Sequence, residues 1–226
     1  MPESEYDPDD ALVPSTPAGY RDPTTFDYSM PALAVVGTAL TVLGIFAFGA
    51  VLDFAQGSDV YDALFVFEEL PDGGFVATLR AGLVFGITVA VVVVTVVAHE
   101  LVHGIVYRRF GYDVSYGLVP SLGAAYAGAF HQFQRSEHVR YVGVAPLLVL
   151  DALFLILLFV PVPFVAFAAF VGLVFNTAGA AGDLYLLWFL SQLPEGTLLY
   201  DSDMRHSYVF KPASKSDSNS SSNAEP

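Results

Sequence analysis

The sequence predicts an all-α membrane protein, a bundle of four transmembrane helices with a short hairpin or re-entrant loop between the second and third helices. Hydrophobic residues make up 54% of the 226 residues and charged residues 14%, whereas charged residues make up about 25% of a typical soluble domain. Mean hydropathy is +0.56. The hydrophobic residues are concentrated in four segments, each long enough to cross a hydrocarbon core of about 30 Å at about 1.5 Å per residue.

The first half of the chain is expected to form a tail and two spans. Residues 1–29 hold seven acidic residues, one arginine and five prolines, a composition typical of a disordered acidic tail. The first span is expected at residues 31–52, which carry no charge. Residues 53–74 contain six acidic residues and no basic one. They connect the first span to the second, which is expected at residues 75–107.

The second half is expected to form the hairpin, two further spans and a second tail. Residues 112–134 are too polar to span a membrane and have too few charges for an ordinary loop, which favours a hairpin or re-entrant loop. The remaining spans are expected at residues 141–160 and 164–193. Residues 30–210 then form one membrane-embedded domain, and the serine-rich residues 211–226 are expected to be a disordered tail.

The distribution of arginines predicts the orientation of the spans. The segment between the second and third spans contains Arg108, Arg109, Arg135 and Arg140, whereas the segment between the first two spans has no basic residue. Because positive charge favours the cytoplasmic side, both termini are expected in the cytoplasm of a multi-pass protein of the cell membrane. Arg80, near the other end of the second span, is a single exception.

The charged residues of the exposed segments also restrict the partners. The formal net charge is −14, which argues against nucleic acid and is typical of proteins from a salt-loving host. The expected partners are the lipid bilayer and a membrane protein or peptide substrate. Cysteine is absent, so any metal would need histidine and carboxylate ligands.

A long aliphatic run ends in the motif His99-Glu100-Leu101-Val102-His103. On a helix, residues four apart lie one turn above each other, so the two imidazoles can share one metal ion. Glu100 lies beside that position and can act as a base toward an attacking water. The alternative is a pair of core histidines with a glutamate facing a polar loop. Three polar groups at the end of an apolar span are costly without partners, which favours a metal site.

A third protein ligand is expected from a later span, because catalytic zinc generally has three. Asp151 and Asp183 both lie inside predicted spans. Counting residues from the span ends places Asp183 at a depth similar to that of His99, and Asp151 nearer the middle of the bilayer. Depth therefore favours Asp183. For Asp151, contact with the metal, support of a ligand, pairing with an arginine and exposure to a polar cavity all remain open.

Two separate segments together carry a family resemblance. His99-Glu100-Leu101-Val102-His103-Gly104 on one predicted span, followed by Asn176-Thr177-Ala178-Gly179-Ala180-Ala181-Gly182-Asp183-Leu184 on a later one, resembles the putative zincin peptidase family of small membrane proteins. That family is similar to the site-2 proteases, many of which have Pro-Asp-Gly where this chain has Gly182-Asp183-Leu184.

The resemblance implies Zn²⁺ bound by His99, His103 and Asp183, with Glu100 as the catalytic general base. It also implies that Asn176 orients the substrate or an oxyanion. A hydrogen bond between helices is the alternative role for Asn176, because polar side chains commonly join membrane helices.

The resulting hypothesis is a zinc metalloendopeptidase of the site-2-protease-like type that cleaves transmembrane or membrane-adjacent peptide segments with metal-activated water. One alternative is a non-catalytic membrane module that a metal stabilises. Another is a metal-dependent hydrolase of a non-peptide membrane substrate.

Overall fold

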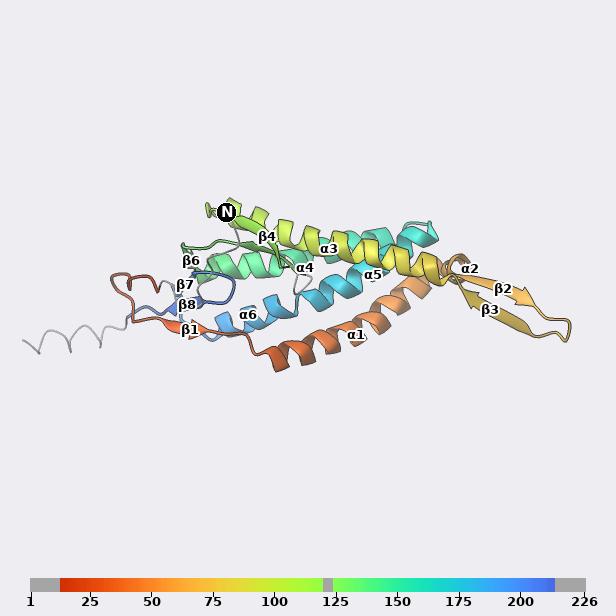
Figure 1. Cartoon of the computed structure of the whole chain (residues 1–226), viewed down its shortest axis with the longest axis horizontal. Helices are drawn as coiled ribbons and strands as arrows, with labels where there is room; N and C mark the ends of the chain where they lie inside the picture. Colours follow the sequence, from red (N-terminus) through yellow and green to blue (C-terminus); the bar gives the residue numbers. More distant parts are fainter. Residues whose placement is uncertain (1–12, 120–123, 214–226) are drawn as a thin grey trace, which may run out of the picture.

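The fold is an elongated helix bundle with β-structure at both ends (Figure 1). The structure, a computed structural model, describes residues 13–119 and 124–213. The helices are α1 (Met30–Gln56), α2 (Ser58–Leu64), α3 (Ala81–Arg109), α4 (Ser136–Leu158), α5 (Pro163–Gly179) and α6 (Ala181–Ser191).

Four helical stretches are long and apolar enough to cross a membrane, as predicted. They are α1, α3, α4 and the combined stretch Pro163–Ser191, in which α5 and α6 meet at Ala180. The main shift in bounds concerns the second span. Its helix begins at Ala81, because Phe75–Leu79 form a strand.

The all-α prediction is wrong in part, because the described residues also contain eight strands in three sheets. Strands β2 (Phe65–Glu69) and β3 (Phe75–Leu79) form an antiparallel hairpin that projects from one end of the bundle, here called the hairpin end (Figure 1). The predicted hairpin between the second and third spans is present as β4 (Ser115–Val119) and β5 (Ala124–Gly128).

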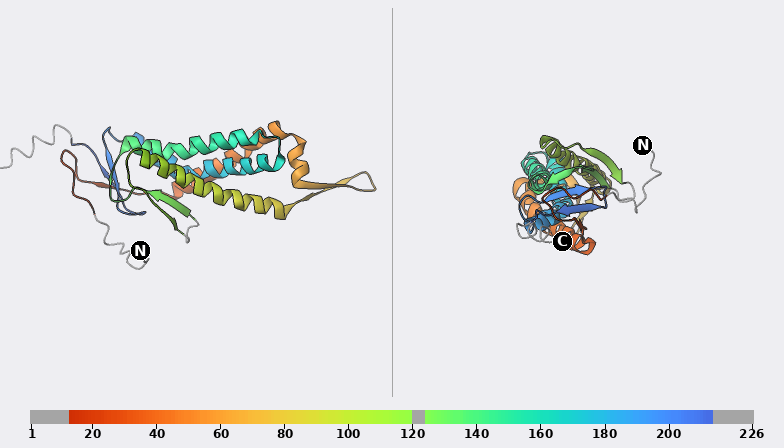
Figure 2. Two further views of the ribbon diagram at one scale, coloured as in Figure 1. Left: turned by 90° about the horizontal axis from the view of Figure 1, so that it is seen from above. Right: turned by 90° about the vertical axis from the view of Figure 1, so that its left-hand side faces the viewer.

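The opposite end, here called the sheet end, carries a four-stranded antiparallel sheet in the order β1-β8-β7-β6 (Figure 2). Its strands are β1 (Thr24–Phe26), β6 (Phe133–Arg135), β7 (Leu198–Asp201) and β8 (Ser207–Phe210). The prediction of a disordered tail is therefore wrong for residues 24–26. Phe26 is buried and packs on the ring of Phe189, which holds β1 against the bundle. Residues 1–12 and 214–226 of the two predicted tails lie outside the described residues.

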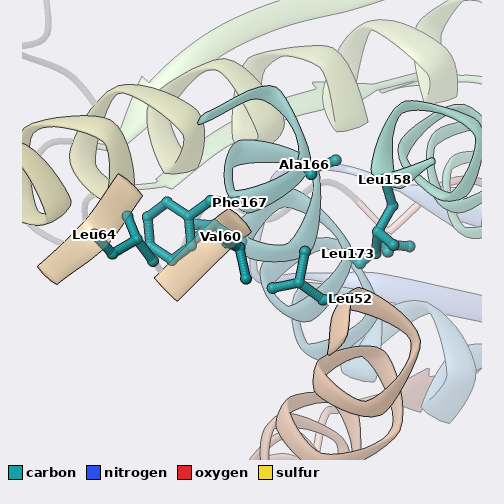
Figure 3. Close-up of a cluster of buried hydrophobic side chains, with 9 residues drawn as sticks. Leu52, Val60, Leu64, Leu158, Ala166, Phe167 and Leu173 are labelled. Carbon is teal, nitrogen blue, oxygen red and sulfur yellow. The ribbon is translucent and has the colours of Figure 1, made fainter. Parts of the chain in front are cut away.

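The hairpin half of the bundle has an apolar core. Apolar side chains from α1, α2, α4 and α5 meet there (Figure 3). Leu158 and Leu173 are fully buried in this cluster. The cluster packs these four helices together at the hairpin end. The buried polar side chains of His99, His103 and Asn176 lie in the other half, toward the sheet end. Its buried members are Leu52, Val60, Leu64, Leu158, Ala166, Phe167, Ala169, Val171 and Leu173.

Candidate metal centre

Helix α3 turns its polar face toward the protein. Thr95, His99, His103 and Tyr107 follow one another at intervals of four residues, and all four are buried. Because such residues share one face of a helix, they form a polar stripe along the inside of the bundle. The exposed side chains on the other faces are apolar up to the last turn, which carries Arg108 and Arg109, as expected for contact with lipid. These include Val93, Val97, Leu101 and Ile105.

The stripe meets one carboxylate from α6. His99 Nε2 lies 3.1 Å from Asp183 Oδ2, and His103 Nε2 lies 3.3 Å from Asp183 Oδ1. Asp183 is in the first turn of α6, immediately after the break at Ala180. Ligands bonded tetrahedrally to zinc at about 2.0–2.1 Å are about 3.3 Å apart. Two imidazole nitrogens and one carboxylate at these separations therefore fit a zinc ion.

Glu100 lies beside the two imidazoles as a second carboxylate. The candidate ligand atoms of His99, Glu100 and His103 all lie within 4.8 Å of one another, so Glu100 competes with Asp183 as third ligand on distance alone. However, Asp183 is nearer to both imidazoles, and Glu100 Oε2 accepts a hydrogen bond of 2.8 Å from the backbone N–H of Ala127 in β5. Asp183 is therefore placed where it could serve as the third ligand, and Glu100 stands next to it.

The β4–β5 hairpin reaches Glu100 because α3 has a glycine where the hairpin crosses it. A Cβ on Gly104 would overlap the phenol of Tyr116 in β4. The same ring receives the guanidinium of Arg108, whose Cζ lies 5.3 Å from the ring centroid, within the range of a cation–π contact. The hairpin therefore packs directly on the helix that carries the motif.

The outward nitrogens of both imidazoles also have partners. The Nδ1–H of His99 donates to Asn176 Oδ1 at 3.0 Å, and that of His103 donates to the backbone oxygen of Val142 at 3.0 Å. Both partners can only accept at these atoms, so each Nδ1 carries a proton, and the Nε2 atom of each ring is directed at Asp183. With Nδ1 held in this way, Nε2 is the atom that would coordinate a metal ion.

Asn176 and Asp151 form a support behind His99. The Nδ2 group of Asn176 donates to Asp151 Oδ1 at 2.9 Å and to the backbone oxygen of Pro146 at 3.2 Å. Thr177 Oγ1 donates to Asp151 Oδ2 at 2.9 Å. Among the alternatives for Asp151, the structure thus favours support of a ligand through Asn176, and it places Asp183 at the imidazoles.

Two cavities border this centre, and both are lined by Tyr28, Glu100, His103 and Asp183. The larger has a volume of about 320 Å³ and extends along α3 and the junction of α5 with α6. The smaller, of about 270 Å³, extends to the four-stranded sheet. We call them the bundle cavity and the sheet cavity.

The sheet cavity contains a partly buried carboxylate that the sequence did not single out. Asp201 in β7 accepts hydrogen bonds from Ser207 Oγ at 2.6 Å and Gln134 Nε2 at 2.9 Å. Burial raises the pKa of Asp201 above its ordinary value. The Ala127 N–H and the Val142 carbonyl were also missed, because backbone groups leave no signal in residue types.

Comparison with known proteins supports this picture. Residues 92–198 match the model of a family described as putative zincin peptidase. No curated protein and no solved structure matches the chain. The matched segment contains both histidines, Glu100, Asn176 and Asp183, and a zincin binds zinc, which the donor set fits. The segment that holds the candidate metal centre is therefore similar to the putative zincin peptidase family, as its sequence indicates.

Proposed function

We propose that the protein is a membrane-embedded zinc metallopeptidase that cleaves transmembrane or membrane-adjacent peptide segments, similar in type to the site-2 proteases. The observation that carries this proposal is the meeting of the His99 and His103 Nε2 atoms with the Asp183 carboxylate, beside Glu100 and inside helices able to cross a membrane. In this proposal the first three residues hold the zinc.

Glu100 is proposed as the general base. When bound, zinc polarises the peptide carbonyl and makes a water molecule more acidic. Glu100 accepts the proton of the attacking water and then delivers it to the leaving amine. The hydrogen bond from the Ala127 N–H fixes one carboxylate oxygen of Glu100, which leaves the other for proton transfer.

Asn176 is proposed to position His99 rather than to bind substrate. Its oxygen accepts from His99, and its amide group donates to Asp151 and Pro146. Asn176 is 1% exposed, so its hydrogen bonds are committed to the protein. This role takes the place of the contact with substrate or oxyanion that the resemblance implied.

The bundle cavity supports the proposal that the substrate reaches the centre from within the membrane. Phe175, which is 45% exposed, lines this cavity together with Gly179 and Gly182. A Cβ added to either glycine would meet no atom within 4 Å. Space therefore exists beside the centre for an extended peptide, on the flank of helices that face lipid.

The positive-inside rule supports a cytoplasmic location for the sheet end. Arg108, Arg109, Arg135 and Arg140 flank the ends of α3 and α4 at the sheet end. We therefore propose a multi-pass protein of the cell membrane with both termini in the cytoplasm. Water and protons would then reach the centre through the sheet cavity.

Glu100→Gln tests the mechanism. The amide cannot accept the proton, so we expect hydrolysis to fall on the order of 10²–10⁴-fold, while the purified variant keeps about one zinc. Zinc content and cleavage of co-purifying peptides would be measured together, with Glu69→Gln on the exposed β2 strand as the control. Full activity in Glu100→Gln would refute the mechanism. Because the variant binds without cleaving, it can also trap the substrate for identification.

A further inference from the structure

We infer that Pro146 is a positioning residue of the metal centre: its missing N–H leaves the carbonyl of Val142 free to hold the imidazole of His103. The inference rests on the proposed function to the extent that His103 is a zinc ligand. It concerns α4, which contributes no ligand itself.

The geometry follows from the helix repeat. In a regular α-helix the N–H of residue 146 would donate to the carbonyl of residue 142. Pro146 lies in the interior of α4 and has no N–H to donate. The carbonyl of Val142 therefore lacks its usual donor in a place where Val142 is only 3% exposed. A buried carbonyl without a partner is costly, most of all in a membrane.

His103 supplies the missing donor. Its Nδ1–H lies 3.0 Å from the Val142 oxygen, so the imidazole takes the place of the proline's absent N–H. The same hydrogen bond keeps the proton on Nδ1 and turns Nε2 toward Asp183, 3.3 Å away. One contact thus satisfies the helix and orients the ligand.

The carbonyl of Pro146 itself extends the effect to the other imidazole. It accepts a hydrogen bond from Asn176 Nδ2 at 3.2 Å, and Asn176 Oδ1 accepts from His99 Nδ1 at 3.0 Å. The partners of both imidazoles are therefore set by one turn of α4. Prolines are also tolerated in membrane helices without any such role, because neighbouring groups satisfy the freed backbone. A positioning role and a merely tolerated proline predict different results for one substitution at residue 146.

Pro146→Ala returns an N–H that competes with His103 for the Val142 carbonyl. We expect the zinc dissociation constant to rise about 10- to 100-fold, the usual cost of losing the partner of a ligating histidine. The thermal stability of the zinc-free protein should stay equal or increase, because alanine suits a helix interior better than proline. A proline with only a structural role would give no change in zinc affinity. Competition with a chelator and thermal unfolding in detergent would measure the two quantities.

Two further variants make the test specific. Pro163→Ala replaces a proline at the first position of α5, where a backbone N–H would have no acceptor within the helix in any case. This substitution should leave zinc affinity unchanged. Replacement of residue 146 by lactic acid forms an ester without an N–H or a ring, and should restore the affinity lost in Pro146→Ala. Unchanged zinc affinity in Pro146→Ala, or no recovery with lactic acid, would overturn the inference. Zinc affinity is measured without substrate, so absence of peptidase activity would not affect this result.

Discussion

The two halves of the bundle are held together by different means. At the hairpin end, Leu52, Leu158 and Leu173 interlock with other apolar side chains (Figure 3). At the sheet end, the same helices α4 and α5 meet α3 and α6 through hydrogen bonds among polar groups, with Asn176 and His99 at the centre. His99, His103 and Asn176 each have a partner, whereas the hydroxyl of Thr95 has none among the described residues. This half also contains two smaller apolar clusters, one with Tyr107 and Val142 and one with Leu190 and Leu199.

This difference separates stability from chemistry. Within lipid, apolar surface gains little by leaving its surroundings, so packing and hydrogen bonds decide how helices associate. The apolar cluster provides close packing without chemical function. The polar half provides oriented donors and acceptors, whose arrangement a metal ion would complete. We therefore expect substitutions in the apolar cluster to leave zinc affinity unchanged, and substitutions at the candidate metal centre to leave the packing of the apolar cluster unchanged.

The largest expected effect is that of Asp183→Ala, which removes a proposed ligand. The zinc affinity of Asp183→Ala should fall by more than about 100-fold. The zinc affinity of Asp151→Ala should fall by only about 10-fold, because Asp151 acts through Asn176. Elemental analysis and chelator competition would give both values. Loss of zinc in Asp151→Ala alone would reverse the assignment of the third ligand.

Leu173→Ala tests the apolar half. Leu173 is fully buried in the cluster, so the substitution leaves a cavity and should lower the free energy of unfolding by about 2 kcal/mol. Zinc affinity should not change. Leu148→Ala is the control, since Leu148 is 62% exposed on α4, and a substitution there should cost less than about 0.5 kcal/mol. Denaturant titration in detergent would compare the unfolding free energies of the two variants. A loss of zinc affinity in Leu173→Ala that is absent in Leu148→Ala would show that the two halves are not separate.

The smallest effect is expected for Asp201→Asn, and it depends on pH. Burial raises the pKa of Asp201 in the folded protein, so the folded state binds this proton more tightly than the unfolded state. Stability from this group is therefore complete below the unfolded pKa of about 3.9 and is lost as the pH rises through the folded pKa. Asparagine cannot ionise, so the variant should be slightly more stable than the wild type at pH 7, and this advantage should disappear toward pH 4.

The same contacts remain possible in that variant. The Asn oxygen can accept from Gln134, and the Ser207 hydroxyl can accept from the Asn amide. Thermal unfolding across this pH range would measure the difference, with Asp62→Asn on the exposed surface of α2 as control. A variant whose stability follows the wild type at every pH would show that Asp201 contributes no such dependence.

Residue types predicted the parts of the molecule that depend on side-chain pattern. The apolar runs predicted four helices able to span a membrane. The spacing of His99 and His103 predicted that both would face the same point, and the depth argument favoured Asp183 over Asp151; the structure brings Asp183 to both imidazoles. Periodicity and depth are properties of each helix alone, which is why a sequence can report them.

The missed parts depend on partners that are distant in the chain. Strand β1 has three residues, too few to show an alternating pattern, and it pairs with β8 near the other end of the sequence. Pro146 could be predicted only to lie near the start of a span. Its relation to His103 requires knowing that α4 packs against α3 at that turn. Backbone partners such as the Val142 carbonyl are the same for every residue type, so no sequence pattern reveals them.

The pairing of β1 with β8 also sets the order in which the protein can mature. The wall of the sheet cavity includes Phe26 and Ser207, so it needs strands from both ends of the described chain. All proposed ligands, by contrast, have been synthesised once α6 is complete. A nascent chain can therefore gather these side chains while the cavity beside them is still open, and the cavity can close only after β8 has left the ribosome.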